Sequence, residues 1–458
     1  MEQMQEILEK ALLLLEEKNY HELKELMIDL EPADVALILE EVPENSISIL
    51  FRLLKKEQAA EVFVELGSDM QELLICSFSD SELKEVFDEL YLDDTVDIIE
   101  EMPANVVKRI LRHSDPTTRQ NINEILKYPK DSAGSIMTIE FVDLKKDMTV
   151  EDAFTRIRRT GIDKETVYTC YVTDENRVLL GLVSVKDLLL SEYSRTLEEI
   201  METSIIYVNT LEDQEEVAKN FEKYDFLALP VVDNEKRLVG IITVDDAIDV
   251  IQEENTEDIE KIAAITPTDK PYMKTSVFET FKKRIPWLLF LMLSATFTGK
   301  IISSYESSLS ACVILTSFIP MLMGTGGNSG GQTSVTIIRS MSLNDFEMKD
   351  VLKVVWKEIR VSLLCGIVLA AANFAKMMLV DRGDIIASGQ DPLMVTIVVC
   401  LALIVTVFFA KLIGCTLPMF AKKIGFDPAV MASPFITTIV DAISLFVFFN
   451  IASSILHL

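Results

Sequence analysis

The sequence predicts a multidomain chain: an all-α helical-repeat region, an α/β pair of similar modules, a connecting helix and an α-helical membrane domain of five spans. Three observations support this prediction. Short amphipathic segments recur in the N-terminal part, one strand-turn-strand-helix pattern occurs twice after it, and apolar runs of about 20 residues fill the C-terminal part. We expect the domains to comprise residues 1–130, 131–256, 257–283 and 284–458. A wholly soluble protein is excluded.

Charge is distributed unevenly along the chain. Of 43 Lys and Arg and 73 Asp and Glu, residues 276–458 hold 14 and 11, which leaves 29 and 62 for residues 1–275. No nucleic-acid partner is expected, because phosphates are repelled by so acidic a surface. The six Cys form no CxxC pair and the three His are far apart, so neither a zinc site nor a disulfide framework is expected. The N-terminal residues lack the pattern of a signal peptide.

Residues 1–130 are expected to form a stack of helix pairs. DVALILEEVP at 34–43 recurs as DTVDIIEEMP at 94–103, and EVFVEL at 61–66 recurs as EVFDEL at 85–90. Each segment has the apolar spacing of a helix with one buried face. Repeated units of this kind bury their apolar faces against one another, which predicts a right-handed helical stack.

The clearest internal repeat lies within residues 131–256. YVTDENRVLLGLVSVKDLL at 171–189 aligns with PVVDNEKRLVGIITVDDAI at 230–248 at a constant offset of 59 residues. Each copy predicts a strand, a tight polar turn, a second strand entered through Gly, and a helix that begins at an acid. This repeat, opened by DSAGSIMT at 131–138, resembles a tandem pair of CBS domains. The resemblance implies that adenine nucleotides or ions bind in the cleft of the pair.

One hydroxyl and one acid occupy matching positions in the two copies. Ser184 with Asp187, and Thr243 with Asp246, have the spacing with which CBS domains hold a ribose. The resemblance therefore implies ATP as a candidate ligand. The alternative is that each acid caps the helix that it begins.

Acidic side chains crowd two segments. Seven acids fall within 14 residues, immediately before a helix that leads toward Pro267, and a further group lies in YLDDTVDIIEEMP. The candidate cation ligands are Asp245, Asp246, Asp249, Glu253, Glu254, Glu257 and Asp258, with Asp93, Asp94 and Asp97 as the second group. Crowded carboxylates repel one another, and divalent cations would relieve that repulsion. A solvated acidic face is the alternative for any single acid.

Five apolar runs are long enough to cross a hydrocarbon core of about 30 Å at about 1.5 Å per residue. We place them at about 286–304, 308–328, 360–380, 393–417 and 429–455. Basic residues cluster before the first run, between the second and third, and before the fifth. By the positive-inside rule these ends face the cytoplasm. We therefore expect a multi-pass cell-membrane protein with its acidic half in the cytoplasm and its C-terminus outside.

Glycine is concentrated in the second expected span. PMLMGTGGNSGGQTS at 320–334 holds five of the chain's 16 Gly within eight positions. Glycine at this density lets helices approach closely or lets a helix unwind around a polar path. On a helix Thr325, Asn328 and Gln332 share one face, and Asn328 is a candidate ion contact. A packing face between helices is the alternative. A phosphate loop is disfavoured because no Lys follows the last Gly.

The fifth expected span carries an acid deep within it. Asp427 and Pro428 are expected to cap this helix and to form its first turn. Asp441 follows 13 residues later, roughly 20 Å along the axis. A carboxylate at that depth costs about 2.5–3.5 kcal/mol on insertion scales and by default marks an ion path.

Other side chains bear on the role of Asp441. Thr437 and Thr438 lie one turn before it and are candidate pore contacts. The alternative to an ion path is that Asp441 forms an ion pair with a buried Lys300 or Lys376.

The order of the segments resembles the MgtE family of magnesium channels over essentially the whole chain. The most specific motifs are PMLMGTGGNSGGQ in the second span and DPAVMASPFITTIVD in the fifth. The resemblance implies a homodimer whose pore is lined by these two spans, with the carboxylate of Asp441 holding the ion. It also implies cytoplasmic domains that bind Mg²⁺ and close the pore when the ion is plentiful. No enzymatic activity is expected.

The residue types agree with a hard divalent cation. Mg²⁺ sheds water reluctantly and is usually held through one or two carboxylates. One Asp per subunit, with Asn, Thr and backbone carbonyls, would supply such a site. No Cys, His or Met lies beside Asp441, which disfavours soft metals. Two alternatives remain: a transporter for another divalent cation such as Mn²⁺ or Co²⁺, and a CBS-regulated membrane signalling protein without ion flux.

Overall fold

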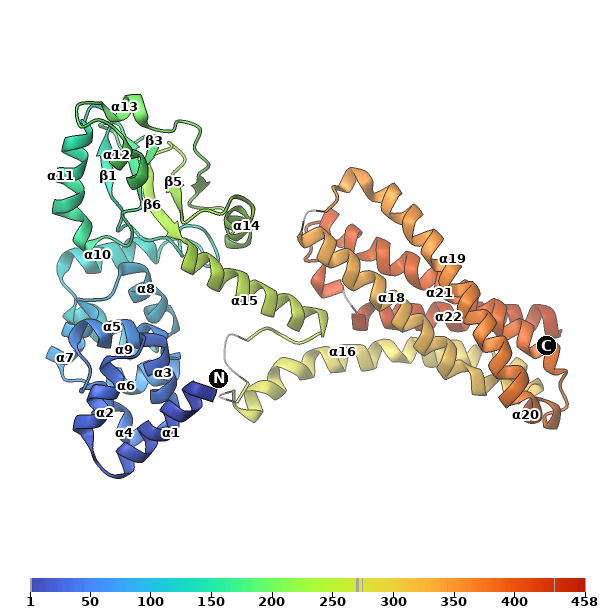
Figure 1. Ribbon diagram of the computed structural model, residues 1–458. Helices are drawn as coiled ribbons and strands as arrows, with labels where there is room; N and C mark the ends of the chain where they lie inside the picture. Colours follow the sequence, from blue (N-terminus) through green and yellow to red (C-terminus); the bar gives the residue numbers. More distant parts are fainter. Residues whose placement is uncertain (1, 269–271, 274, 344, 432, 458) are drawn as a thin grey trace. The chain divides into compact units, whose positions relative to one another are not determined.

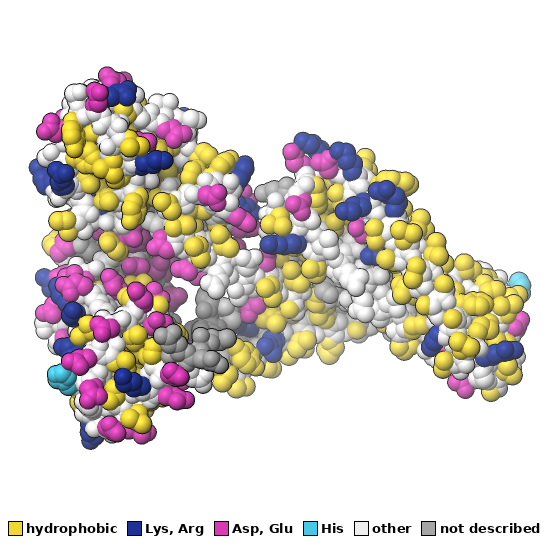
Figure 2. Space-filling model, in the orientation of Figure 1, with side chains coloured by type: hydrophobic (Ala, Val, Ile, Leu, Met, Phe, Trp, Pro, Cys, Tyr) yellow, Lys and Arg dark blue, Asp and Glu magenta, His cyan; other side chains and the backbone are white. Residues whose placement is uncertain are grey.

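The computed structural model describes residues 2–268, 272–273, 275–343, 345–431 and 433–457. The chain forms two compact units, Met1–Ile251 and Gln252–Leu458. The first unit contains the N-terminal helices and both copies of the repeat, and the second contains the long apolar helices (Figure 1). On the face shown in Figure 2, acidic side chains are spread over the first unit and apolar side chains cover much of the second.

Short helices build the N-terminal part of the first unit. The helices α3, α5, α7 and α9 pack against one another in succession, and their apolar faces share one core. Both copies of the longer repeat end alike, because α3 and α8 stop at an extended residue, Val42 or Met102, that precedes a Pro. The bounds are α1 (Glu2–Glu16), α2 (Tyr20–Ile28), α3 (Pro32–Glu41), α4 (Glu44–Phe51), α5 (Lys56–Glu65), α6 (Ser68–Ser77), α7 (Asp80–Phe87), α8 (Leu92–Glu101), α9 (Ala104–His113) and α10 (Pro116–Ile125).

The repeat folds as two equivalent three-stranded sheets, in the orders β1-β2-β3 and β4-β5-β6. In each sheet the first pair is parallel and the second antiparallel, and both antiparallel pairs have a register shift at the same place, after Val172 and after Val231. The bounds are β1 (Asp143–Lys145), α11 (Val150–Thr160), η1 (Gly161–Asp163), β2 (Thr169–Thr173), β3 (Leu179–Ser184), α12 (Val185–Leu190), α13 (Leu197–Ile200), β4 (Val208–Asn209), α14 (Gln214–Tyr224), β5 (Ala228–Val232), β6 (Leu238–Thr243) and α15 (Val244–Ile262).

The two glycines at matching positions of the repeat are required by close backbone contacts. A Cβ on Gly181 would lie 2.9 Å from the carbonyl oxygen of Glu202, and one on Gly240 would lie 2.7 Å from that of Thr138. Those distances are too short for any larger residue without movement of the backbone. Both modules therefore have the same strand order and require Gly at the same position, as the 59-residue offset predicted.

The connecting helix is continuous with the second module. α15 runs from Val244 to Ile262, so the expected boundary between residues 256 and 257 falls inside a helix. No Gly or Pro interrupts this stretch, and nothing local stops the helix. The compact units instead divide after Ile251.

The second unit is a bundle of long helices. Four of them are long and apolar enough to cross a membrane, over Val277–Ser304, Met348–Ala387, Pro392–Lys423 and Pro434–Leu456 of the described residues. The bounds are α16 (Val277–Ser304), α17 (Glu306–Ala311), η2 (Val313–Phe318), α18 (Ile319–Ser342), η3 (Met348–Asp350), α19 (Val351–Lys376), η4 (Met377–Asp381), α20 (Arg382–Ala387), α21 (Pro392–Lys423), η5 (Ala429–Met431) and α22 (Ser433–Leu456).

The second expected span is displaced along the sequence. Residues 308–328 do not form one helix: short helical turns occupy most of Glu306–Phe318, and α18 starts only at Ile319, with Pro320 in its first turn. This fifth long helix continues through the glycine segment to Ser342 without unwinding. Its glycines and polar side chains keep it outside the set of strongly apolar helices. It is helical because α21 and α22 pack along it.

The start of the fifth expected span also differs from the prediction. The carboxylate of Asp427 accepts a hydrogen bond from the backbone N–H of Ala429, 2.8 Å away, at the start of the short 3-10 turn η5. α22 begins later, at Ser433. Asp427 therefore caps η5 and not the membrane helix.

Candidate ion-binding sites

One face of α18 is a close-packing surface made of glycines. A Cβ on Gly326 would lie 2.9 Å from Ser444 Oγ of α22, and one on Gly327 would lie 2.9 Å from Thr437 Cγ2. A Cβ on Gly414 of α21 would clash with the carbonyl oxygen of Gly330, so these two helices touch backbone to backbone. The packing interpretation is therefore right for this face.

The opposite side of α18 is polar and exposed in the single chain. Gly324, Asn328 and Gln332 are exposed at i, i+4 and i+8, so they form a stripe along the helix. No atom lies within 4 Å of the Cβ position of Gly324. A polar stripe is unfavourable against lipid and suits water or a second polar surface. One face of α18 thus packs against other helices, and the opposite face presents polar groups. Both interpretations of the glycine segment therefore apply, each to a different face.

Asp441 projects from the middle of the bundle helix α22 and is half-buried. Its Oδ1 is shielded from solvent and has no hydrogen-bond partner among the described residues. The alternative ion pairs are not formed: Lys376 pairs with Asp381 at 2.8 Å, and Lys300 is exposed. An unpartnered carboxylate oxygen at this depth is the feature that a cation would satisfy.

The two threonines before Asp441 have separate roles in the single chain. Thr438 donates its hydroxyl hydrogen bond to the carbonyl of Pro434 in the same helix, at 3.1 Å. Thr437 packs its methyl group against Gly327 of α18. Thr437 therefore lies at the contact between the two expected pore helices, whereas the hydroxyl of Thr438 is used within α22.

A buried polar network beside α18 was not found from the sequence. The ammonium of Lys411, on α21, donates to Thr333 Oγ1 at 3.2 Å, and Thr333 donates to Glu358 Oε2 on α19, also at 3.2 Å. Lys411 is only 6% exposed. A lone Lys inside the apolar run FFAKLIGC was the available signal, since ionisable residues in spans are rare. Thr333 and Glu358 could not be linked to it from the sequence, because they lie on other helices.

Replacing Asn328 with Leu is expected to lower ion flux several-fold without loss of the fold, because the side chain is exposed and supplies donors and acceptors to a hydrated ion. Flux into vesicles containing the purified protein measures the effect. Gly327→Leu is the contrasting variant: it should disrupt helix packing and assembly because of the nearby Thr437. Normal flux in Asn328→Leu would restrict the role of the segment to packing.

Acids from distant parts of the sequence gather in the first unit. Asp93, Asp94 and Asp97 lie on α8. The charges of Asp245 and Asp246, at the start of α15, act on Asp94, that of Asp246 acts on Asp97, and that of Asp93 acts on Asp246. The structure thus brings the two groups of candidate ligands together, except for those on the second half of α15. Among the described residues, no three Asp, Glu, His or Cys side chains converge closely enough to hold a bare metal ion. The arrangement suits an ion that keeps its water.

The pKa values of these carboxyls are raised. Loss of surrounding water, and then the charge of Asp246, raise the pKa of Asp94 to about 7. The same two causes raise the pKa of Asp97, which lies at the solvent-facing edge of the cluster, to about 8. Burial and the neighbouring Asp94 raise the pKa of Asp93. Burial and Asp93 also raise the pKa of Asp246, against the hydrogen bonds from Thr243. Each carboxylate thus resists ionisation because burial and the neighbouring carboxylates both disfavour its charged form.

Two further acids belong to this cluster. Burial, followed by the charge of Asp93, raises the pKa of Glu165 to about 9. Glu140 accepts a hydrogen bond from the backbone N–H of Leu92 at 3.4 Å and acts on Asp93 and Asp94. Both lie in irregular segments of the first module, where no sequence pattern marked them. Burial and Asp245 raise the pKa of Asp249.

The other four expected ligands lie on the second half of α15. They are Glu253, Glu254, Glu257 and Asp258. Glu257 pairs with Lys261 at 2.7 Å, and the same ammonium pairs with Asp427 at 2.8 Å. Glu257 is therefore engaged by a cation of the chain itself. This pair of contacts ties the end of α15 to the segment that precedes α22.

The two hydroxyl-acid pairs of the modules are helix caps. Ser184 and Asp187 form a reciprocal capping box at the start of α12. Thr243 donates to Asp246 Oδ2 at 2.6 Å, and its backbone N–H does so at 3.3 Å. The capping interpretation is thus observed in both copies. Asp246 caps α15 and also belongs to the acidic cluster.

The stability of the first unit is expected to fall as pH rises when divalent cations are absent. The cluster's folded pKa values, about 7 to 9 for Asp94, Asp97 and Glu165, lie above the ordinary values of 3.8 and 4.5. Their contribution is therefore fully present below pH about 4 and is lost as pH rises through these values. The measurement is resistance of residues 1–251 to proteolysis in the full chain with a chelator at pH 5 and pH 9.

Added Mg²⁺ is the control for that pH effect. At pH 9 the carboxylates are ionised, so Mg²⁺ should restore protection there and do little at pH 5. Na⁺ at matched ionic strength should restore much less. Equal protection at both pH values with a chelator would contradict a cluster governed by mutual repulsion.

Fold and composition together define a class of membrane proteins in which an acidic unit with paired α/β modules precedes a bundle of long apolar helices. Family profiles match three parts of the chain: a divalent cation transporter domain, MgtE, at residues 319–451; the MgtE intracellular N domain at 30–131; and CBS domains at 133–192 and 197–253. The magnesium transporter MgtE of Thermus thermophilus is 36% identical over 447 residues, covering 97% of each chain. The chain belongs to the MgtE family.

Further relatives agree along the chain. The magnesium transporter MgtE of Bacillus subtilis is 31% identical and covers 99% of this chain and 98% of its own. The cytosolic domain of the Mg²⁺ channel MgtE, solved in complex with ATP, is 38% identical with a TM-score of 0.50, over 52% of this chain and 96% of that one. The soluble part of a magnesium transporter is 30% identical with a TM-score of 0.51, over 55% and 99%.

Proposed function

We propose that this chain conducts Mg²⁺ across the cell membrane, with Asp441 as its pore ligand. The observation that carries the proposal is the shielded, unpartnered carboxylate oxygen of Asp441 in a membrane helix. Ser334 and Thr406, on the neighbouring helices α18 and α21, also hold shielded hydroxyl oxygens without partners among the described residues. Water around a hydrated ion would satisfy such groups.

The conducting unit is a homodimer in this proposal. The exposed stripe of Gly324, Asn328 and Gln332 supports it, because this polar face of α18 is unsuited to lipid. A two-fold axis beside the stripe would enclose it and place two Asp441 carboxylates across the pore. Basic residues before α16 and α22 support a cytoplasmic N-terminal part and an external C-terminus. Lipid of the membrane surrounds the remaining helix faces.

Cytoplasmic Mg²⁺ closes the pore through the acidic cluster. The helix that begins in the cluster, α15, ends on the membrane unit: Ile262 packs with Ile338, Met341 and Met419 of α18 and α21. The Lys261–Asp427 ion pair adds a polar contact at the same end. Mg²⁺ bound among the carboxylates would favour the closed state, in which this helix is held in place. The size of the shift equals the difference between the free energies of Mg²⁺ binding to the closed and open states.

The CBS pair binds an adenine nucleotide in this proposal. A solved relative of the cytosolic part holds ATP, and the two modules here share its fold. Ser184 and Thr243 already bond to Asp187 and Asp246 at the starts of their helices. The ribose would therefore contact these two acids without breaking their bonds to Ser184 and Thr243. Calorimetric titration of ATP into the full chain, with and without Mg²⁺, tests this binding.

Flux measurements on the purified protein decide among the candidate functions. Vesicles containing the full chain should take up Mg²⁺ down its gradient, more readily than Mn²⁺ or Co²⁺, because carboxylate, amide and hydroxyl oxygens suit a hard ion. A preference for Mn²⁺ or Co²⁺ would favour the other divalent-cation transporter. Absence of any flux from correctly folded protein would favour the signalling alternative.

A further inference from the structure

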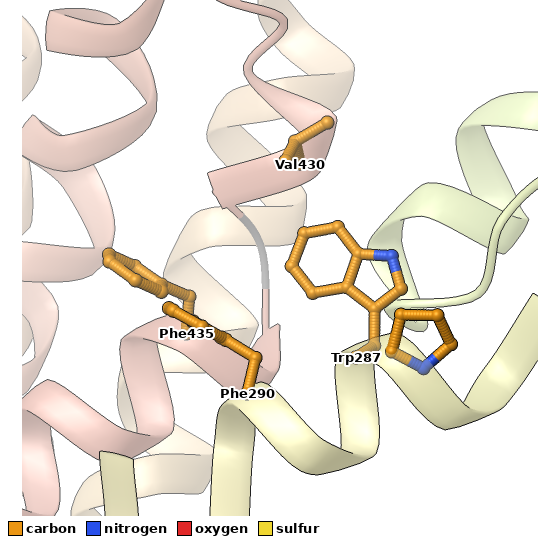
Figure 3. Close-up of a pocket in the computed structure, with 5 residues that line it drawn as sticks. Trp287, Phe290, Val430 and Phe435 are labelled. Carbon is orange, nitrogen blue, oxygen red and sulfur yellow. The ribbon is translucent and has the colours of Figure 1, made fainter. Parts of the chain in front are cut away.

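An apolar cavity of about 370 Å³ opens between α16 and the start of the last membrane segment. It is lined by Pro286, Trp287 and Phe290 of α16, by Val430 of η5 and by Phe435 of α22 (Figure 3). The rings of Phe290 and Phe435 are stacked, with centroids 6.2 Å apart and planes 10° from parallel. Figure 3 shows the indole of Trp287 on the other side of the opening. Every lining residue is apolar, so the cavity suits a hydrocarbon chain.

Basic side chains lie on the helix turn immediately before this cavity. Lys282 and Lys283 stand four residues before Pro286 and Trp287, so each shares a helix face with a lining residue. Lys282 and Arg284 are exposed, and neither forms an ion pair with a described residue. The ammonium of Lys283 is already bonded to the carbonyl of Pro267 at 2.9 Å. The ammonium of Lys282 lies over the ring of Phe278, 5.1 Å from its centroid. Two exposed cations without an ion pair among the described residues therefore stand at the polar end of an apolar cavity.

We propose that this cavity binds the acyl chain of an anionic phospholipid whose phosphate is held by Lys282 and Arg284. The charge pattern selects this occupant, because a cationic rim followed by an apolar wall matches an anionic head followed by a hydrocarbon tail. Trp at this level also fits the membrane interface, where its ring packs on the chain and its N–H faces the headgroups. The inference uses the membrane orientation proposed above but not the identity of the ion.

The occupant would contact the helix that carries the pore carboxylate. Phe435 precedes Asp441 by six residues on α22, about 9 Å along the axis. Val430 belongs to η5, which Asp427 caps, and Asp427 pairs with Lys261 of α15. An acyl chain between Phe290 and Phe435 would thus rest against both the pore helix and the segment tied to the connecting helix. Membrane composition would then act at the same elements as cytoplasmic Mg²⁺.

Fluorescence of Trp287 tests the proposal directly, because the chain has only two Trp. Replacing the other, Trp356, by Phe leaves Trp287 as the sole reporter. The full chain is reconstituted in phosphatidylcholine vesicles that contain equal fractions of brominated-chain phosphatidylglycerol or brominated-chain phosphatidylcholine. Quenching by the anionic lipid should indicate tighter association, by roughly fivefold for each of the two exposed basic side chains.

Two charge variants in this background separate a specific site from general attraction. Lys282→Gln with Arg284→Gln should remove the preference for phosphatidylglycerol. The matched control, Lys353→Gln with Lys357→Gln, removes two exposed cations from α19 and should leave it intact. Equal quenching by both lipids, or equal loss of preference in both double variants, would overturn the proposal. Because no ion flux is measured, such a failure would leave the proposed Mg²⁺ conduction untouched.

Discussion

Asp441→Ala is expected to abolish most Mg²⁺ flux while the protein still folds and inserts. The substitution removes an unpartnered carboxylate, so no hydrogen bond within the described chain is lost. A contact between a charged group and a hydrogen-bonded partner is worth about 1.5–3 kcal/mol, which corresponds to roughly a ten- to hundredfold loss of ion occupancy. The measurement is Mg²⁺ uptake into vesicles, with the oligomeric state and the thermal unfolding of the variant recorded alongside.

Two further substitutions make this prediction specific. Asp441→Asn should be intermediate if hydrogen bonds to the ion's water suffice, because the amide keeps an acceptor oxygen but loses the charge. Glu306→Gln neutralises an exposed acid of the same unit and should leave flux unchanged. Flux at the wild-type level in Asp441→Ala would show that the ion path does not use this carboxylate.

Joint replacement of Asp245, Asp246 and Asp249 by Ala is expected to give a channel that internal Mg²⁺ inhibits much less. Burial and neighbouring carboxylates raise the pKa of two of these acids, Asp246 and Asp249, and at Asp246 the main neighbour is Asp93 of α8. At ten times its Kd, one bound ion stabilises the closed form by about 1.4 kcal/mol, about tenfold in the ratio of closed to open channels. The variant loses both the stabilisation of the closed form by the bound ion and the repulsion between the carboxylates. Its open probability should therefore fall less steeply as cytoplasmic Mg²⁺ rises.

The measurement is open probability in excised patches against cytoplasmic Mg²⁺, with protease protection of residues 250–268 as a second readout. The matched control replaces Glu9 and Glu16 of α1, and Glu17 directly after it, by Gln; all three are exposed acids on the same unit. That control should keep the wild-type curve, which separates the cluster from net charge. An unchanged curve in the Asp variant would assign the acids to a solvated surface.

The sequence alone determined the properties that depend on local pattern. The 59-residue offset predicted two modules with the same strands, glycines and helix starts, because each copy carries its own turn and strand signals. The position of Asp441 in a membrane helix followed from the length of the apolar run around it. Net charge and hydropathy likewise separated the acidic unit from the helical bundle.

The tertiary structure decided how residues from different segments meet. The limits of α18 were misplaced because its glycine segment has little helix propensity, and contacts with α21 and α22 hold it helical. Glu165 and the Lys411–Thr333 contact had no local pattern, since each depends on elements far apart in the chain. Propensity and hydropathy act over a few turns, whereas burial of a charge and raised pKa values depend on every element that packs around it.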